Sequence, residues 1–213
     1  MGTNEKRGKL EIAVFARAPV SGRVKSRLAE EIGASEAIAV YVELLRRTVD
    51  AVLAACRERD DLVPVLWHLG DWPESFPLPP QIASNLHRQP HEEMLENLRE
   101  VFRSDPRSPR RDAIAVAADH PEIEASHVLA VASLLGNADV VVGPAEDGGF
   151  WSLGAAVDLG EVLRGLPVGT DVALSSLERA VRDAGLTLGR GPTLYDIDTA
   201  EDLRRWRGQI HRE

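Results

Sequence analysis

Short apolar runs alternate along this chain with longer segments in which apolar residues recur at a helical period. Such runs are typical of strands that are buried on both faces of a sheet. They predict strands at 10–16, 62–69, 113–118, 138–142 and 150–156, and a further strand near 83–88. A period of about 3.6 residues predicts helices at 24–32, from a Ser35 cap to Cys56, at 92–102, from a Ser126 cap to Leu135, and at 170–184. A last helix at 200–207 follows Thr199, which has the spacing of a capping box with Asp202.

Two segments interrupt this alternation. Four prolines predict an irregular connection over 70–82, and the prolines and arginines of 104–112 predict an exposed loop. The order of the remaining elements predicts one three-layer α/β domain with a mostly parallel sheet over 10–213, after a flexible tail at 1–9. Ligands of such sheets bind beyond the carboxyl ends of the strands, so we expect the site in the loops that follow strands.

Composition narrows the class of partner. The chain has 213 residues, 25 basic and 34 acidic side chains and a net charge of −9. This balance argues against a broad surface for nucleic acid or anionic membrane, but it allows a small anionic ligand in a local pocket. No apolar run approaches the roughly 18 residues of a membrane span. We therefore expect a cytoplasmic protein, and a homodimer is compatible with the sequence. Cys56, the single cysteine, excludes an internal disulfide and a multi-cysteine zinc site, and we expect it to be buried.

The first loop with candidate chemistry is ARAPVSGRVKSRL, residues 16–28. A strand leads there through a turn into a helix that carries Arg23, Lys25 and Arg27. Backbone N–H groups and the helix dipole favour anions at a helix N-terminus, and nearby cations add to that preference. The loop therefore predicts a phosphate site, although the spacings of the P-loop and of the GxGxxG motif are absent. The alternative is an ordinary turn before an exposed basic helix.

The second loop is AADHPEI, residues 117–123, where Asp119 follows a buried strand and Pro121 prevents that strand from continuing. A carboxylate in this position is a candidate ligand for Mg²⁺ or Mn²⁺, which prefer oxygen donors. The alternative is an Asx turn. For His120, a surface or packing role is more typical than metal ligation.

The third loop is GPAEDGGFW, residues 143–151. Gly148 and Gly149 permit close approach of the backbone to a ligand. Glu146 and Asp147 beside them are candidates for an acid, a base or a metal ligand. A common turn is the alternative.

A further segment, YDIDTAEDL at 195–203, carries Asp196 and Asp198, which we expect to alternate in direction about a strand end. We expect only one of the two to face the crevice. Either one also has a simpler interpretation, which is stabilisation of the N-terminus of the following helix.

Four segments, FARAPVSGRVKSRL, ADHPEI, VVVGPAEDGGFWSLG and YDIDTAEDL, occur in this order. Together they resemble the DUF2064 family of glycosyltransferase-like proteins over about residues 10–207. That family looks like a compact branch of the GT-A, or nucleotide-diphospho-sugar transferase, superfamily, and it is related to molybdenum-cofactor and phospholactate nucleotidylyltransferases. The positions that match its motifs are Pro19, Gly22, Lys25, Arg27, Asp119, Asp196, Asp198, Thr199 and Asp202. The positions that depart from them are Arg17, Ser26, Ala118, His120, Phe150 and Trp151, where the family pattern has lysine, threonine, serine, cysteine and two tyrosines.

The resemblance implies a GT-A-like domain that takes a nucleotide-activated donor and a small acceptor, with Mg²⁺ or Mn²⁺ as cofactor. It implies that Asp119 and Asp198 hold the cation, and that Lys25 and Asp147 are catalytic, with Asp147 as the base for the acceptor. The implied nucleotide-binding residues are Ala16, Pro19, Gly22, Arg23, Lys25 and Arg27. The implied substrate-binding residues are Glu146, Asp147, Gly148, Gly149 and Trp151.

Three functions remain open at this point. The first is a metal-dependent glycosyltransferase with a nucleotide-diphospho-sugar donor. The second is a nucleotidylyltransferase, in which an acceptor phosphate attacks the α-phosphorus of a nucleoside triphosphate. The third is a nucleotide-binding or partner-binding protein without turnover, because a fold does not by itself guarantee chemistry.

Overall fold

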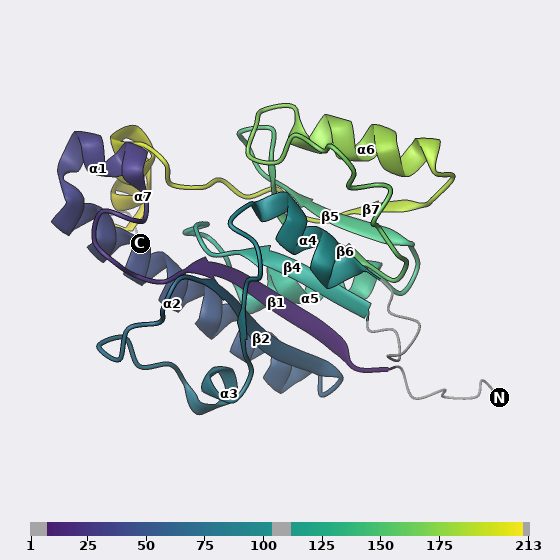
Figure 1. The fold of residues 1–213 in the computed structure, drawn as a ribbon, viewed down its shortest axis with the longest axis horizontal. Helices are drawn as coiled ribbons and strands as arrows, with labels where there is room; N and C mark the ends of the chain where they lie inside the picture. Colours follow the sequence, from purple (N-terminus) through teal and green to yellow (C-terminus); the bar gives the residue numbers. More distant parts are fainter. Residues whose placement is uncertain (1–7, 104–111, 211–213) are drawn as a thin grey trace.

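Seven strands form one sheet in a computed structural model that describes residues 8–103 and 112–210 (Figure 1). The strands are β1 (Leu10–Arg17), β2 (Leu62–Leu69), β3 (Leu86–Arg88), β4 (Asp112–Ala117), β5 (Val140–Pro144), β6 (Phe150–Ala155) and β7 (Leu188–Arg190). The helices are α1 (Ser26–Ile32), α2 (Ala34–Glu58), α3 (Pro80–Ala83), α4 (Met94–Phe102), α5 (Ala125–Leu134), α6 (Ala173–Asp183) and α7 (Ala200–Ile210). The first seven residues of the predicted tail and nearly all of the predicted 104–112 loop lie outside the described residues.

The sheet has the order β3-β2-β1-β4-β6-β5-β7. Strand β1 pairs in parallel with β2 along its whole length, from Leu10 opposite Leu62 to Arg17 opposite Leu69, and it pairs in parallel with β4 on its other side. Strand β6 is antiparallel to both of its neighbours, while β7 runs parallel to β5. The sheet is therefore mostly parallel, as predicted, and the carboxyl ends of β1 and β4 lie side by side at one edge.

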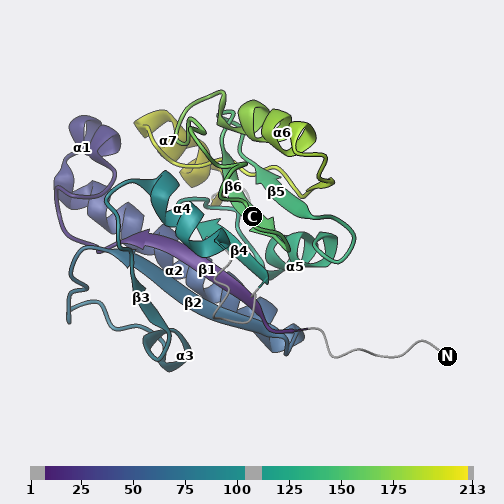
Figure 2. The same cartoon turned by 45° about the vertical axis from the view of Figure 1, so that its right-hand side comes forward.

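Helices cover both faces of the sheet, which gives the three predicted layers (Figures 1 and 2). In β1, Ile12 and Val14 pack against α2 and α5, while Ala13 and Phe15 pack toward α4 and α6. Both sets are buried, which explains why the strand reads as a continuous apolar run rather than an alternating one. Cys56 is half-buried against the α2 side of the core, and burial raises the pKa of its thiol to about 11.

Two predicted helix caps are wrong. Helix α2 begins at Ala34 after Gly33, whose φ of 88° both ends α1 and turns the chain into α2, so Ser35 lies inside the helix. Helix α5 begins after Glu124, which forms a capping box with His127, so Ser126 does not cap it. The capping box of Thr199 and Asp202 is present, with the Thr199 N–H donating to Asp202 Oδ2 at 2.8 Å.

Two short elements were not expected. Strand β7 extends the sheet beyond β5, and α3 forms at the end of the proline-rich 70–82 segment. Among the described residues, no helix has both the length and the apolar character that a bilayer-spanning helix requires.

Candidate functional site

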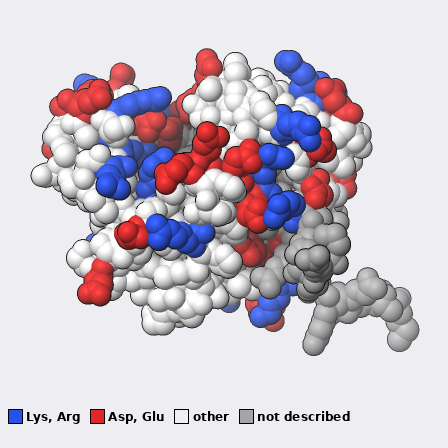
Figure 3. Space-filling view, viewed as in Figure 1, with Lys and Arg blue, Asp and Glu red and all other residues white. Residues whose placement is uncertain are grey.

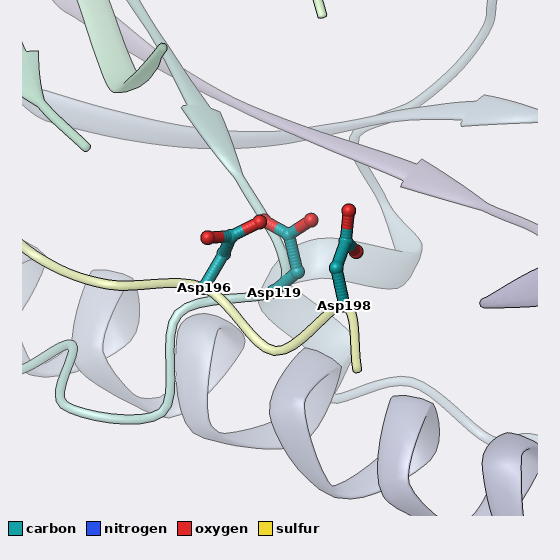
Figure 4. A group of neighbouring side chains, drawn as sticks. All are labelled: Asp119, Asp196 and Asp198. Carbon is teal, nitrogen blue, oxygen red and sulfur yellow. The ribbon is translucent and has the colours of Figure 1, made fainter. Parts of the chain in front are cut away.

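Three aspartates meet at the carboxyl edge of the sheet. Asp119 lies two residues beyond β4, and Asp196 and Asp198 lie in the irregular segment that precedes α7. One carboxylate oxygen from each residue lies within 4.8 Å of the others (Figure 4). The Ile197 N–H donates to the Asp119 backbone oxygen at 3.2 Å, which joins the two segments.

The expectation that only one of Asp196 and Asp198 faces the crevice is wrong. Residues two apart in an extended segment point to the same side. Ile197 between them is fully buried against Leu28 and Leu203. The buried isoleucine therefore directs both carboxylates toward Asp119.

Lys25 lies between two of these carboxylates. Its Nζ is 3.1 Å from Asp119 Oδ2 and 2.8 Å from Asp198 Oδ1, and its side chain is only 7% exposed. Burial disfavours the ammonium, but the charges of Asp119 and Asp198 outweigh this effect and hold the pKa of Lys25 well above its ordinary value. Lys25 precedes α1 with a φ of 47° and is the only non-glycine residue with positive φ in the described part of the chain.

Asp119 is held in its ionised form. Burial raises its pKa, but Lys25 and His120 outweigh burial, so the pKa of Asp119 lies well below its usual range. The Nδ1 atom of His120 is 3.0 Å from Asp119 Oδ1. Since an ionised carboxylate only accepts hydrogen bonds, Nδ1 carries the proton in this contact. His120 is buried, and among the described residues its Nε2 has no hydrogen-bond partner.

Asp196 differs from Asp119 in its electrostatic surroundings. Burial raises its pKa, and the carboxylates of Asp119, Asp198 and Asp147 raise it further, to about 6, against a smaller effect of Lys25. Three ionised carboxylates and one ammonium carry a formal charge of −2. This donor set fits a hard divalent cation, which prefers carboxylate oxygens and is stabilised by their net negative charge.

Two cavities border the aspartates. One, of about 290 Å³, lies over the end of β1, and the other, of about 220 Å³, lies on the α4 and α6 side of the sheet. Asp119 and Asp198 line both. The face drawn in Figure 3 is notched between the α1 side and the α6 side of the molecule, and side chains of both charges stand along the notch.

The cavity over β1 is bordered by three of the six predicted nucleotide-binding residues, Ala16, Lys25 and Arg27. The exposed Arg27 guanidinium also lies 3.4 Å from Asp198 Oδ2. The other three, Pro19, Gly22 and Arg23, lie in the preceding turn and do not border it. Helix α1 starts at Ser26, so Arg23 and Lys25 precede the helix rather than lie on it, contrary to the prediction.

Sequence reasoning missed Tyr41 and Gln89, which also line this cavity. Tyr41 belongs to the buried apolar stripe of α2, yet its hydroxyl contacts the backbone of Arg17. Gln89 is buried and donates to the Trp67 backbone oxygen at 2.7 Å. Tyr41 could have been identified from the sequence, because it places a polar hydroxyl within an otherwise apolar helical stripe.

The smaller cavity is bordered by Asp147 and Gly149. Asp147 Oδ1 accepts a hydrogen bond from the Gly149 N–H at 2.8 Å, so this aspartate forms the local turn and also faces the cavity.

Three other predicted substrate contacts have different roles. Glu146 forms two hydrogen bonds with Arg205 of α7, at 2.6 and 2.9 Å, and does not line either cavity. Trp151 borders the smaller cavity, but its indole is 1% exposed and donates to the Pro192 backbone oxygen at 2.8 Å. It is a core residue whose edge reaches the smaller cavity. Position 148 has room only for glycine, because a Cβ on Gly148 would lie 2.0 Å from the Asp171 backbone oxygen.

Solved structures share this fold at low sequence identity. A protein of Desulfovibrio desulfuricans G20, described as a candidate nucleotide-diphospho-sugar transferase, is 22% identical with a TM-score of 0.76, covering 91% of this chain and 84% of that one. A CMP:2-keto-3-deoxy-manno-octonic acid synthetase complexed with CTP is 14% identical with a TM-score of 0.52, covering 96% and 99%. Rv0371c from Mycobacterium tuberculosis H37Rv, in complex with manganese, is 14% identical with a TM-score of 0.50, covering 93% and 97%. These similarities confirm the predicted α/β fold of the nucleotide-diphospho-sugar transferases.

No curated protein matches the chain. A family model described as an uncharacterised protein conserved in bacteria, DUF2064, matches residues 52–170, which is more than half of the sequence. The chain therefore belongs to the DUF2064 family, as its motifs indicated.

Proposed function

We propose that this protein is a metal-dependent transferase that takes a nucleotide-diphospho-sugar donor and a small acceptor. The observation that carries the proposal is the group formed by Asp119, Asp196 and Asp198 between two cavities, with Lys25 beside it. A donor and an acceptor that react must meet at one point, and the two cavities share Asp119 and Asp198. Support comes from the fold that the chain shares with three solved structures. One is described as a candidate nucleotide-diphospho-sugar transferase, one is a synthetase complexed with CTP, and one is a complex with manganese.

The donor side is the cavity over β1. Lys25 and Arg27 there would contact the phosphates, and the three aspartates would hold Mg²⁺ or Mn²⁺ against them. When bound, such a cation offsets the negative charge that develops on a diphosphate leaving group. Tyr41 and Gln89 also border this cavity and would position the nucleoside.

The acceptor side is the smaller cavity. In the proposed reaction an acceptor hydroxyl attacks the anomeric carbon of the sugar, its C–O bond forms, and the bond from that carbon to the nucleoside diphosphate breaks. The hydroxyl proton passes to Asp147, which borders this cavity. Its Oδ1 is already bound to the Gly149 N–H, so the other carboxylate oxygen would take the proton.

Nucleotidyl transfer is the second candidate, and the likeness to the synthetase complexed with CTP favours it. There the acceptor itself is the anionic nucleophile, so no protein base is needed and Asp147 would only position the acceptor. The same phosphate and cation contacts would serve the α-phosphorus instead of the sugar.

The experiment begins with a thermal-shift panel of nucleoside diphosphate sugars and nucleoside triphosphates, each with and without Mn²⁺. Ligands that bind the folded state stabilise it by mass action, so the panel identifies the donor. Release of nucleoside diphosphate in the presence of acceptors then supports glycosyl transfer, and release of pyrophosphate supports nucleotidyl transfer. Asp119→Asn should abolish the metal-dependent shift, whereas Asp71→Asn on the surface is the matched control. If none of the ligands shifts the melting temperature, the proposal fails, and a partner-binding protein without turnover is the alternative that gains support.

A further inference from the structure

We infer that Lys25 gates the cation site: its ammonium holds Asp119 and Asp198 in the free protein, and a cation gains both carboxylates only when Lys25 leaves them. This inference rests on the proposed function, because it assumes that the aspartates bind a divalent cation. It adds that phosphate groups of the nucleotide, by drawing Lys25 away, would make cation binding depend on the nucleotide.

Every carboxylate oxygen of Asp119 and Asp198 already faces a donor. Asp119 Oδ1 contacts His120 at 3.0 Å and its Oδ2 contacts Lys25 at 3.1 Å. Asp198 Oδ1 contacts Lys25 at 2.8 Å and its Oδ2 contacts Arg27 at 3.4 Å. Each oxygen has a second lone pair, but a cation bound there would lie beside the positively polarised donor that occupies the first, so these donors oppose cation binding.

Lys25 is the donor that both carboxylates share. Its side chain is 7% exposed and bridges the two residues, whereas the Arg27 side chain is 77% exposed and contacts one. Surface ion pairs are weak and screened, so Arg27 gives way at little cost. The buried ammonium is a like charge beside the incoming cation, and it has to move if both aspartates are to become ligands.

The cavity over β1 offers the Lys25 ammonium an alternative position. Lys25 lines this cavity, which is assigned to the nucleotide, and its flexible stem lets the ammonium exchange carboxylate oxygens for phosphate oxygens.

The backbone of Lys25 has a φ of 47°, in the left-handed region that residues other than glycine rarely adopt. Such a conformation persists only where surrounding contacts hold it, and the two ion pairs are contacts of that kind.

The test measures Mn²⁺ binding to the full chain without nucleotide. The electron paramagnetic resonance signal of free Mn²⁺ reports how much of the ion remains unbound. Lys25→Asn removes the ammonium and keeps a residue that tolerates positive φ, and Lys25→Met is a second variant in case one does not fold. We expect both to bind Mn²⁺ about tenfold or more tightly than the unmodified protein, which lies in the usual range of coupling between ligands. The distant Arg164→Gln, which removes an exposed guanidinium paired with Glu161, should leave the affinity unchanged. Circular dichroism checks that each variant is folded.

A second readout separates displacement of Lys25 from simple loss of a positive charge. Acetic anhydride labels exposed amines, and the exposed Lys9 of the same chain is the internal reference. Lys25 should label slowly in the free protein, and Mn²⁺ alone should accelerate its labelling relative to Lys9. Equal Mn²⁺ affinity of the unmodified protein and the Lys25 variants, or Mn²⁺ binding without faster Lys25 labelling, would overturn the gate and leave the proposed function standing. If Mn²⁺ binds neither the unmodified protein nor the Lys25 variants, the gate fails together with the metal dependence of the proposed function.

Discussion

The hydroxyl of Tyr41 accepts a hydrogen bond from the Arg17 N–H and donates one to the Arg17 backbone oxygen, both at 2.8 Å. Tyr41 lies on α2, and Arg17 is the last residue of β1. The tyrosine thus satisfies the backbone where β1 ends and fixes the strand end that borders the larger cavity.

Tyr41→Phe should therefore destabilise the protein and weaken nucleotide binding. Removing the hydroxyl leaves the partly buried donor and acceptor of Arg17 without this partner, which costs about 1–3 kcal/mol for such groups. Urea unfolding measures the loss. The matched control is Tyr195→Phe, which removes one hydroxyl contact with the Gln209 side chain. A Tyr41→Phe protein as stable as the Tyr195→Phe protein would show that the Arg17 contacts contribute little.

Gly148→Ala should destabilise the fold more than an equivalent change at another glycine with positive φ. A Cβ at Gly148 would lie 2.0 Å from the Asp171 backbone oxygen, and the residue has a φ of 88°. Left-handed backbone alone costs an alanine about 1–2 kcal/mol. The overlap with Asp171 adds to this, and the loop would have to move.

Gly165→Ala is the control, because Gly165 has a φ of 69° and open space around its Cβ position. Its melting temperature therefore reports the backbone cost alone. Equal melting temperatures for the two variants would indicate that the loop before α6 moves aside at no cost.

The strands β1, β2, β4, β5 and β6 could be predicted because each is a run of consecutive, largely buried apolar residues. In β2 the predicted and observed bounds coincide at 62–69, and Asp119 could be placed at a strand end because Pro121 prevents continuation. The helix starts could not be fixed in the same way. Ser35 is a good capping residue by type, but Gly33 had already set the start of α2 through its positive φ.

The candidate site could be predicted only where a residue's role depends on its neighbours in sequence. Trp151 was expected to contact substrate, but the register between β5 and β6 shifts at Gly143 and Pro144, and the side chain is buried in the core beside the smaller cavity. Glu146 was expected beside a substrate, but it binds Arg205, 59 residues away. Pairing of this kind depends on tertiary packing, which the spacing of motifs does not encode.

Asp147→Asn should reduce turnover strongly if this residue is the base for the acceptor. Loss of a general base typically lowers the rate by about 10²–10⁴-fold. The asparagine can keep the hydrogen bond to the Gly149 N–H through its side-chain oxygen, so the loop should stay folded. The measurement is kcat with the donor identified by the binding panel.

The adjacent Glu146→Gln is the matched control for that change. Glu146 lines neither cavity and forms an exposed ion pair with Arg205, so its loss should cost at most about 1 kcal/mol of stability and leave kcat unchanged. Equal turnover of Asp147→Asn and the unmodified protein would remove Asp147 from the role of base. It would favour nucleotidyl transfer, which needs none.

Asp196→Asn should change how stability depends on pH in the absence of divalent cations. The pKa of Asp196 is about 6 in the folded protein and 3.8 ordinarily. Between these values the unfolded chain has lost this proton and the folded protein keeps it, so the contribution of Asp196 to stability falls as pH rises from about 4 to about 6. Asparagine does not ionise and escapes this loss. The variant should therefore be more stable than the unmodified protein above pH 6, and the difference should shrink toward pH 4.

Chemical denaturation at a series of pH values measures this difference, with Asp71→Asn as a control for loss of a surface carboxylate. Added Mn²⁺ should reverse the order above pH 6, because the cation stabilises the protein that has all three carboxylates. In that protein Mn²⁺ binding should also weaken as pH falls through about 6, since proton and cation compete for Asp196. The difference in stability between Asp196→Asn and the unmodified protein could instead be the same at every pH. Ionisation of Asp196 would then not destabilise the cation-free protein, and the role of this residue would be only structural.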